Sequence, residues 1–279
     1  MPSLLIVGGL TVDRFVDGST APGGSVLHAG QAAAAEGVAP TFVTVAGPEP
    51  EARAGLDRLR QIGQLVVQDA PTTTTYRHGE VDGRRVLLYE TPSEPLRAET
   101  FDRIADPEVA LLAPIAHEVP APLVGEITAR VRPRLTVLLI QGWLRRLSVG
   151  EPTHPVPLDA LDESTWATFG ATDVVVLSTE DLAESAEDPF AQAAEVRARL
   201  GPAPLLVLTL GTEGYLLDDP RADRVVATVP RRVVSGVPSV GAGDTFGAVL
   251  AIRLARGWEP AAAAAAASDG VIRMLESRR

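Results

Sequence analysis

Short apolar runs recur along the chain, and helix-patterned stretches separate them. The runs cover residues 4–7, 41–45, 109–112, 136–140, 173–177 and 205–210. The helix-patterned stretches cover residues 26–35, 52–61, 123–131 and 190–200, and a helical pair at 245–256 and 260–275 closes the chain. Continuous apolar strands alternating with helices indicate a mainly parallel sheet covered on both faces. We therefore expect one α/β domain over residues 1–279, with no linker that divides it.

The composition limits the partners of this chain. Its net charge of −11 argues against a broad surface for nucleic acid or for an anionic membrane, so neither partner is expected. No apolar run is long enough to cross a bilayer, and no charged segment precedes the first run as in a signal peptide. Because the chain has no Cys, it has no disulfide framework, and we expect a cytoplasmic protein.

Lys, Asn and Cys are all absent from the sequence. Without Lys, the chain has neither a Walker-A phosphate loop nor a Schiff base to pyridoxal phosphate. Without Cys, thiolate catalysis and Cys-ligated zinc are excluded. The Gly8-Gly9-Leu10 segment after the first apolar run does not supply a dinucleotide-binding fingerprint. Any phosphate site must therefore be built locally, from backbone, metal and a few Arg side chains.

The run Gly241-Ala242-Gly243-Asp244 opens a helix-patterned stretch. Small residues let backbone N–H groups converge, and a helix start adds the positive end of its dipole, so the run predicts an anion site. The Asp244 carboxylate would repel a resting phosphate, but it suits a base that deprotonates an attacking hydroxyl. The alternative interpretation is that Asp244 serves only as a helix N-cap.

One segment departs from the α/β pattern. Residues 72–78 and 84–89 alternate in polarity, and Val81-Asp82-Gly83 lies between them. Asp-Gly is a strong signal for the turn of a β-hairpin, so we expect a hairpin inserted here.

These features together resemble the ribokinase-like (PfkB) family of small-molecule kinases. Gly241-Ala242-Gly243-Asp244-Thr245-Phe246 is similar to the C-terminal signature of that family. The other landmarks follow in the same order: Thr11-Val12-Asp13 after the first strand, Gly23-Gly24 before an Ala-rich helix, residues 173–181 near the metal and residues 205–214 beside the nucleotide. The resemblance covers nearly the whole chain.

The resemblance implies a ribokinase-like α/β fold with a small β-lid formed near residues 13–24 and 72–90, through which two chains could pair as a homodimer. It implies ATP and Mg²⁺ as cofactors, and a small polyol as substrate. The implied catalytic residues are Asp244, Gly241, Ala242, Gly243 and Arg145. The implied residues for the acceptor are Asp13, Gly24, His28 and Gln141, those for the nucleotide are Ser178, Thr209, Gly211 and Gly214, and those for the metal are Glu180 and Asp181.

Several of these residues also have a structural interpretation. Asp13 could be an ordinary turn residue, and His28 a partly buried helix residue. The sequence also departs from the family pattern. Pro238 stands where many members carry an Asp linked to a monovalent cation, so we expect little dependence on potassium. His28 replaces an Asn, and Ser178-Thr179-Glu180-Asp181 replaces an Asn-x-x-Glu motif.

The segment Gln141-Gly142-Trp143-Leu144-Arg145 follows a predicted strand and resembles myo-inositol kinases and some archaeal nucleoside kinases. Aromatic residues make up only 4% of the chain, which disfavours a site that stacks a nucleobase. The sequence therefore predicts an ATP-dependent kinase that phosphorylates a hydroxyl of a sugar or cyclitol. The alternatives are a nucleoside kinase, a non-catalytic sugar-binding or regulatory protein on the same fold, and a nucleotide hydrolase.

Overall fold

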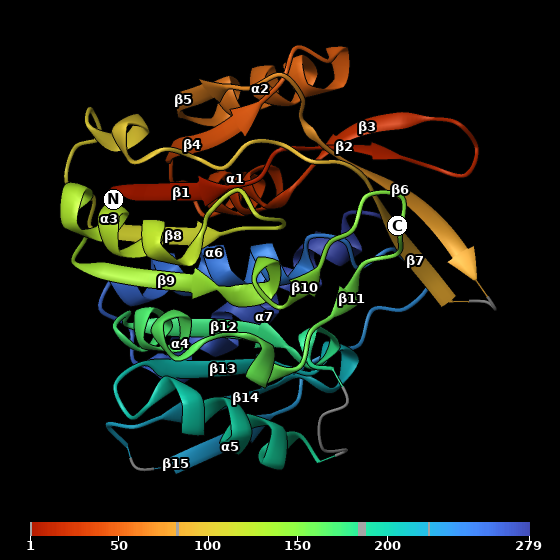
Figure 1. Ribbon diagram of the computed structural model, residues 1–279. Helices are drawn as coiled ribbons and strands as arrows, with labels where there is room; N and C mark the ends of the chain where they lie inside the picture. The colour runs from red at the N-terminus through yellow and green to blue at the C-terminus, as the bar shows by residue number, and fades with distance from the viewer. Residues whose placement is uncertain (1, 82–83, 184–187, 223) are drawn as a thin grey trace.

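The computed structural model describes residues 2–81, 84–183, 188–222 and 224–279. A nine-stranded sheet forms its centre, in the order β15-β14-β13-β12-β9-β8-β1-β4-β5 (Figure 1). Neighbouring strands from β5 to β13 are parallel, and β14 and β15 close one edge in antiparallel pairing. The strands are β1 (Leu4–Gly8), β4 (Thr41–Ala46), β5 (Gln64–Asp69), β8 (Val109–Ala113), β9 (Leu135–Leu139), β12 (Val174–Ser178), β13 (Leu205–Thr209), β14 (Tyr215–Asp219) and β15 (Arg224–Thr228).

Helices cover both faces of this sheet. They are α1 (Ser25–Ala35), α2 (Pro50–Ile62), α3 (Ala121–Val131), α4 (Glu163–Gly170), α5 (Pro189–Leu200), α6 (Ala242–Ala255) and α7 (Pro260–Glu276). In β1, Leu4 and Ile6 pack with α1, α2, α6 and α7 on one face, and Leu5 and Val7 pack with α3, α4 and α5 on the other. This burial on both faces explains why the central strands are apolar throughout rather than alternating.

The strands predicted from the apolar runs all form, and each end lies within one residue of its predicted position. The main error among the predicted helices is the start of α6, which lies at Ala242 rather than at residue 245. The sequence did not predict α4, β5, β14 and β15. Strand β5 is half-buried at the sheet edge, and its sequence Gln-Leu-Val-Val-Gln-Asp lacks the continuous apolar run of the central strands.

A second, four-stranded sheet projects beyond the carboxyl ends of the central strands, in the order β3-β2-β6-β7 (Figure 1). Its strands are β2 (Thr11–Arg14), β3 (Thr20–Gly23), β6 (Thr74–Val81) and β7 (Arg84–Thr91). The predicted antiparallel pairing of residues 74–81 with 84–91 is present, but the predicted turn at Asp82-Gly83 lies outside the described residues. We call this sheet the lid sheet.

Strand β2 joins the two parts of the lid sheet, because it pairs with β3 on one side and in parallel with β6 on the other. The pleat then sorts side chains by face. Asp13 is opposite Tyr76, and His78 is opposite Leu87, so these four residues share one face. On the other face the Glu90 carboxylate pairs with Arg14 and Arg77.

Three Arg side chains surround Glu36, the C-cap residue of α1, whose own side chain is 6% exposed. Its carboxylate pairs with Arg253 of α6, with Arg256 at 3.6 Å and with Arg273 of α7 at 3.1 Å. The Arg253 guanidinium also lies 4.6 Å from the centroid of the Trp258 ring. This cluster ties the carboxyl-terminal end of α1 to α6 and α7.

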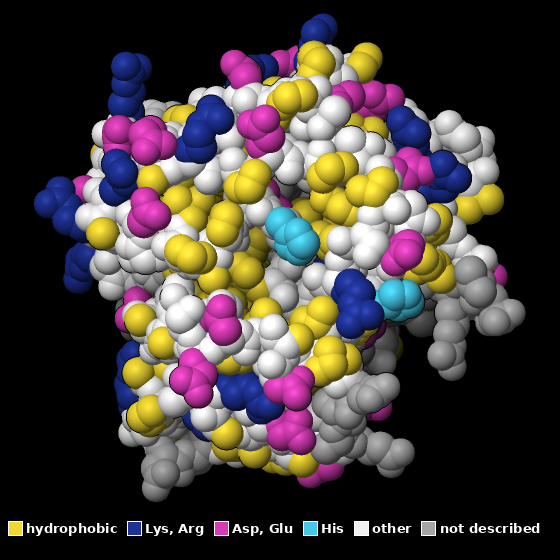
Figure 2. Space-filling view, viewed as in Figure 1, with side chains coloured by type: hydrophobic (Ala, Val, Ile, Leu, Met, Phe, Trp, Pro, Cys, Tyr) yellow, Lys and Arg dark blue, Asp and Glu magenta, His cyan; other side chains and the backbone are white. Residues whose placement is uncertain are grey.

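The surface shows no segregation of charge on the face drawn in Figure 2. Acidic and basic side chains are interspersed there, and hydrophobic side chains gather in a hollow across the middle. No helix among the described residues combines the length and the apolar character needed to cross a membrane.

Candidate active site

A cleft of about 1660 Å³ lies at the carboxyl ends of the parallel strands, where open α/β sheets bind ligands. Gln141 follows β9, Ser178 ends β12 and Thr209 ends β13. The lining includes every residue that the sequence predicted for the site: Asp13, Gly24, His28, Gln141, Arg145, Ser178, Glu180, Asp181, Thr209, Gly211, Gly214, Gly241, Ala242, Gly243 and Asp244. The structure therefore brings together groups that are more than 200 residues apart in the chain.

The start of α6 forms one wall of this cleft. Gly241 is the N-cap in the left-handed conformation, with φ of 78°, and Ala242 begins the helix. The interpretation of Asp244 as the N-cap is therefore wrong, because Asp244 is the third helical residue and its side chain caps nothing. The Ala242 N–H donates to the Ser239 carbonyl at 3.0 Å. The N–H groups of Gly243 and Asp244 precede the first intrahelical bond and remain available to an anion.

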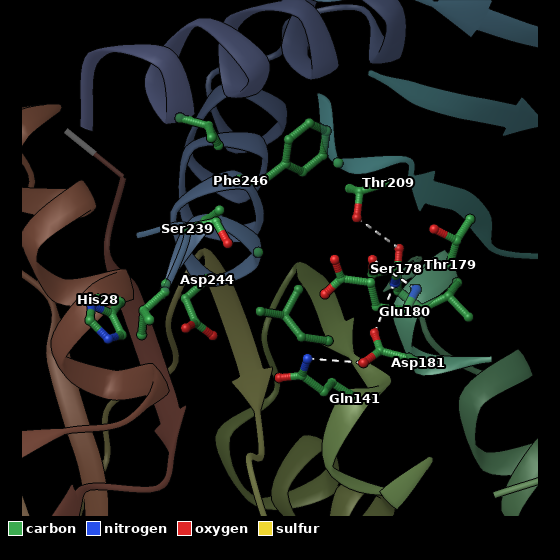
Figure 3. Close-up of a pocket in the computed structure, with 18 of the residues that line it drawn as sticks. His28, Gln141, Ser178, Thr179, Glu180, Asp181, Thr209, Ser239, Asp244 and Phe246 are labelled. Carbon is green, nitrogen blue, oxygen red and sulfur yellow. Dashed lines mark hydrogen bonds between the residues drawn. The ribbon is translucent and has the colours of Figure 1, made fainter. Parts of the chain in front are cut away.

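The Asp244 carboxylate points into the cleft, between His28 on α1 and Gln141 below it (Figure 3). Burial raises the pKa of this carboxyl above its usual range, and the negative charge of Asp181 adds to the rise. Electrostatic interactions with the His28 and Arg145 side chains lower the pKa of Asp244 again. A carboxylate of raised basicity suits proton abstraction better than an exposed Asp.

His28 and the glycines around it fix the distance between α1 and α6. A Cβ atom on Gly241 would lie 2.6 Å from Nδ1 of His28, so the backbone at the N-cap of α6 lies against the imidazole. Gly24, the N-cap of α1, has a φ of 99°, and a Cβ there would lie 2.9 Å from the backbone nitrogen of Thr11. Only Gly fits these two positions without displacing the His28 side chain in one case and the backbone at Thr11 in the other.

Asp13 lies at the lid end of the cleft, which we define by Asp13, Gly24, His78 and Leu87. Its Oδ1 accepts a hydrogen bond from the Thr11 hydroxyl at 2.9 Å, and its Oδ2 lies 3.4 Å from Nε2 of His78. The His78 ring stacks on Phe15, with centroids 4.7 Å apart. The sequence prediction missed His78. Its spacing of two from Tyr76 in an alternating strand is the signal that puts it on the same face.

Gln141 and Asp181 form a hydrogen-bonded network at the ends of β9 and β12 (Figure 3). The Gln141 Nε2 donates to Oδ1 of Asp181 at 2.9 Å, and the Ser178 N–H donates to its Oδ2 at 2.9 Å. Ser178 in turn accepts from the Glu180 N–H, so the turn is a capping box. Both Asp181 oxygens thus already hold hydrogen bonds, and burial raises the pKa of this carboxyl.

The opposite end of the cleft is apolar. We define the α7 end by the aliphatic residues Val233, Val237, Val271, Ile272 and Leu275. Its polar border includes Thr209, whose hydroxyl donates to the Leu177 carbonyl, and Gly211, Thr212 and Gly214 in the turn that follows β13. The segment after α7 holds the neighbouring loop, because the Arg278 guanidinium donates to the Pro238 carbonyl at 2.6 Å.

Arg145 supplies positive charge between these two ends. It belongs to β10 (Arg145–Arg146), a short strand paired with β11 (His154–Pro155). Its Nη1 donates to the Ile115 carbonyl at 3.3 Å. Its charge lowers the pKa of both Asp181 and Asp244, so the guanidinium lies within electrostatic range of the cleft carboxylates.

Comparisons with known proteins identify the family and the fold. The family "pfkB family carbohydrate kinase" matches residues 11–269. No curated protein matches the chain in sequence. Among solved structures, a pyrophosphate-dependent kinase of the ribokinase family, in complex with a pyrophosphate analog and myo-inositol, has a TM-score of 0.77 at 18% identity, covering 95% of this chain and 92% of the other.

Two further structures are similar over the full length. The ribokinase of Arabidopsis thaliana, in complex with ribose and ATP, has a TM-score of 0.71 at 17% identity, covering 98% of each chain. A microbiome-derived acarbose kinase has a TM-score of 0.71 at 20% identity, covering 100% of this chain and 99% of the other. The predicted ribokinase-like fold is confirmed by these neighbours. Because the family match spans most of its length, the chain belongs to the pfkB family of carbohydrate kinases and is a phosphotransferase.

Proposed function

We propose that this protein transfers the γ-phosphoryl group of ATP to a hydroxyl of a sugar or cyclitol. The observation that carries the proposal is the position of Asp244. Its half-buried carboxylate faces the cleft from the first turn of α6, beside open backbone N–H groups and within range of the Arg145 charge. A base, anion donors and a fixed cation are the groups that phosphoryl transfer requires.

In this mechanism Asp244 takes the proton of the acceptor hydroxyl. The hydroxyl oxygen then forms a bond to the γ-phosphorus, while the bond from that phosphorus to the β–γ bridging oxygen breaks and ADP leaves. The Gly243 and Asp244 N–H groups donate to the phosphoryl oxygens, and Arg145 neutralises the charge that spreads over them. Asp13, Gly24, His28 and Gln141 orient the acceptor, with Asp13 accepting from hydroxyl groups.

The α7 end favours a nucleotide over pyrophosphate as the donor. Its wall is formed by aliphatic side chains, which suit the faces of a nucleobase. Pyrophosphate has no base and needs cationic neighbours instead. Arg232 borders this end, but its guanidinium already pairs with Glu276. The similarity to a pyrophosphate-dependent kinase makes the donor an essential part of the test.

Magnesium fits the cleft through Glu180 better than through Asp181. Glu180 is exposed, whereas both oxygens of Asp181 hold hydrogen bonds. Among the described residues no group of three or more His, Cys, Asp or Glu side chains could hold a metal ion. Mg²⁺ in kinases is held by one or two carboxylates together with the substrate phosphates, so such a group is not required. The bound ion would neutralise charge on the nucleotide phosphates.

The lid end favours a polyol over a nucleoside as the acceptor. Among the described lining residues at this end, Tyr76 is the one Phe, Tyr or Trp side chain, and it is 1% exposed, so its ring face is not open for stacking. Carboxylate, imidazole and amide groups at Asp13, His28 and Gln141 instead suit hydroxyl groups. The myo-inositol bound by a structural neighbour makes cyclitols a specific candidate.

A single screen tests the proposal. Phosphate transfer is measured with ATP or pyrophosphate as donor, against sugars, inositols and nucleosides, in the presence of magnesium. We expect transfer from ATP that depends on a sugar or an inositol and that is lost in Asp244→Asn. Transfer from pyrophosphate alone would refute the donor assignment. Binding of polyols without any phosphate transfer would instead support the non-catalytic alternative.

A further inference from the structure

The Ile115 backbone is the meeting point of a lid residue and a cleft cation. Ile115 lies just after β8 and lines the cleft. Its carbonyl accepts a hydrogen bond from the Tyr76 hydroxyl at 3.1 Å and from Nη1 of Arg145 at 3.3 Å. Tyr76 belongs to β6 of the lid sheet, and Arg145 belongs to β10. One acceptor atom therefore joins two parts of the protein that are far apart in sequence.

A buried carboxylate holds this backbone segment in place. Glu118 is 3% exposed, and its Oε1 accepts from the Ile115 N–H at 2.7 Å, while its Oε2 accepts from the Ala116 N–H at 2.8 Å. Burial raises the pKa of this carboxyl, and the two N–H groups and the charge of Arg145 lower it again. Burial of a carboxyl group costs free energy unless the group is hydrogen-bonded. Any movement of the segment that breaks these two bonds is therefore unfavourable.

Close packing fixes the same segment from two sides. A Cβ atom on Gly9 would lie 2.6 Å from Oε1 of Glu118, and a Cβ on Gly142 would lie 2.6 Å from the Pro114 carbonyl oxygen. Both glycines therefore let neighbouring backbone pack directly against residues 114–118. The Ile115 carbonyl is thus a fixed point, against which the Arg145 guanidinium is placed.

We propose that Tyr76 and Glu118 are positioning residues for Arg145, and that they couple the lid sheet to phosphoryl transfer through the Ile115 carbonyl. The inference rests on the proposed function, in which Arg145 neutralises the transferred phosphoryl group. Tyr76 is opposite Asp13 in the β2–β6 pairing, so the position of Asp13, which binds the acceptor, is linked to that of the Tyr76 hydroxyl. An acceptor that holds the lid sheet in place through Asp13 therefore also holds Arg145 in place.

Tyr89 provides a matched control. Its ring lies 5.6 Å from that of Tyr76 on the same face of the lid sheet, and it is 5% exposed against 1% for Tyr76. Burial raises the pKa of Tyr89 to about 12. Its hydroxyl, however, is not among the donors to Ile115. Tyr76→Phe and Tyr89→Phe thus each remove one buried hydroxyl from the lid, but only the first removes the bond to the Ile115 carbonyl.

A double-mutant cycle tests the coupling. We expect Tyr76→Phe to lower kcat about tenfold, the loss expected for one hydrogen bond that places a charged group, with the donor KM close to wild type. Tyr89→Phe should leave kcat nearly unchanged. In an Arg145→Ala background, Tyr76→Phe should have little further effect, because its target is already gone. An undiminished loss in that background, or an equal loss in Tyr89→Phe, overturns the proposal.

A second measurement keeps the test independent of turnover. The guanidinium N–H signals of Arg145, assigned by their absence in Arg145→Ala, are followed by nuclear magnetic resonance. We expect Tyr76→Phe and Glu118→Gln to shift or broaden them, and Tyr89→Phe to leave them in place. Unchanged signals in both Tyr76→Phe and Glu118→Gln overturn the proposal even if no acceptor is phosphorylated. An inactive wild type with these shifts refutes the proposed function alone.

Discussion

The backbone of Gly241 lies against the imidazole of His28, so that the N-cap of α6 and the first turn of α1 are in direct contact. A side chain at residue 241 would have to occupy the space of the His28 ring. The contact therefore fixes both the start of α6, where Asp244 lies, and a ring that borders the same cleft.

We expect Gly241→Ala to lose both stability and turnover. A residue with a Cβ atom in the left-handed region costs about 1–2 kcal/mol, and the clash with His28 adds an overpacking cost of about 1–3 kcal/mol. Gly257→Ala is the matched control, because Gly257 has a φ of 77° and no atom within 4 Å of its Cβ position. Urea unfolding and turnover are compared. Equal losses of stability in the two variants would show that the His28 contact contributes nothing.

Asp244→Asn should fold and bind its ligands but turn over far more slowly. Asn keeps the size of the side chain but cannot take a proton, and the loss of a general base lowers a rate about 10²–10⁴-fold. Turnover and melting temperature are measured on the same preparation. A variant that keeps most of its activity would show that Asp244 is not the base.

The pH profile of kcat/KM should show an acid limb above the usual range of an Asp, about 3.9. The base acts only when deprotonated, so activity is lost as the pH falls through the raised pKa of Asp244. Since the Arg145 charge lowers that pKa, Arg145→Ala should move the limb to higher pH. The profiles of both proteins are measured with the same acceptor. A limb that does not move would place the Arg145 charge outside the range of the base.

His78→Leu should weaken acceptor binding while leaving the donor KM unchanged. Leu retains apolar contact with Phe15 but removes the nitrogen that lies 3.4 Å from the Asp13 carboxylate. The loss of this polar contact with the carboxylate that orients the acceptor should raise the acceptor KM about tenfold. His78→Asn, which keeps a polar group, should recover part of the loss. A donor KM that rises in parallel would indicate general damage to the lid sheet instead.

Glu180→Gln should raise the magnesium concentration needed for half-maximal rate by about tenfold, as expected for a carboxylate that acts through metal-bound water. Glu213 is the matched control, since it is also exposed and lies in the neighbouring turn Gly211–Glu213 but does not line the cleft. Titrations of rate against magnesium are compared for wild type, Glu180→Gln and Glu213→Gln. If the two variants respond alike, Glu180 has no specific role with the metal.

The sequence predicted the central strands well because burial on both faces leaves continuous apolar runs. It could not predict β14 and β15, where Asp218 and Asp219 interrupt the apolar pattern at the antiparallel edge of the sheet. The parallel pairing of β2 with β6 was also beyond local patterns, since it joins segments about 60 residues apart (Thr11 opposite Thr74). Long-range pairing of this kind leaves no mark in either strand alone.

In the candidate site, too, some residues could be predicted from local sequence and others only from long-range contacts. The small residues and the acid of the run Gly241–Asp244 indicate an anion site at a helix start by themselves, so this position was predictable. The N-cap proved to be Gly241. His78 and Glu118 have no distinctive neighbours in sequence. Their roles depend on Asp13 and Ile115, which only the folded chain brings to them. The roles of the predicted ligand-binding residues stay predictions until the experiments above are done.

The ion cluster around Glu36 acts at a distance from the cleft. Helices α1 and α6 touch at one end through His28 and Gly241, and at the other through Glu36 and Arg253. With a rise of about 1.5 Å per residue, the Glu36 end lies roughly 12 Å along α1 from His28. The two helices are thus held together at both ends. A change of charge at Glu36 would change the angle between α1 and α6. The position of His28 relative to the Asp244 carboxylate would then change, although no contact inside the cleft is altered.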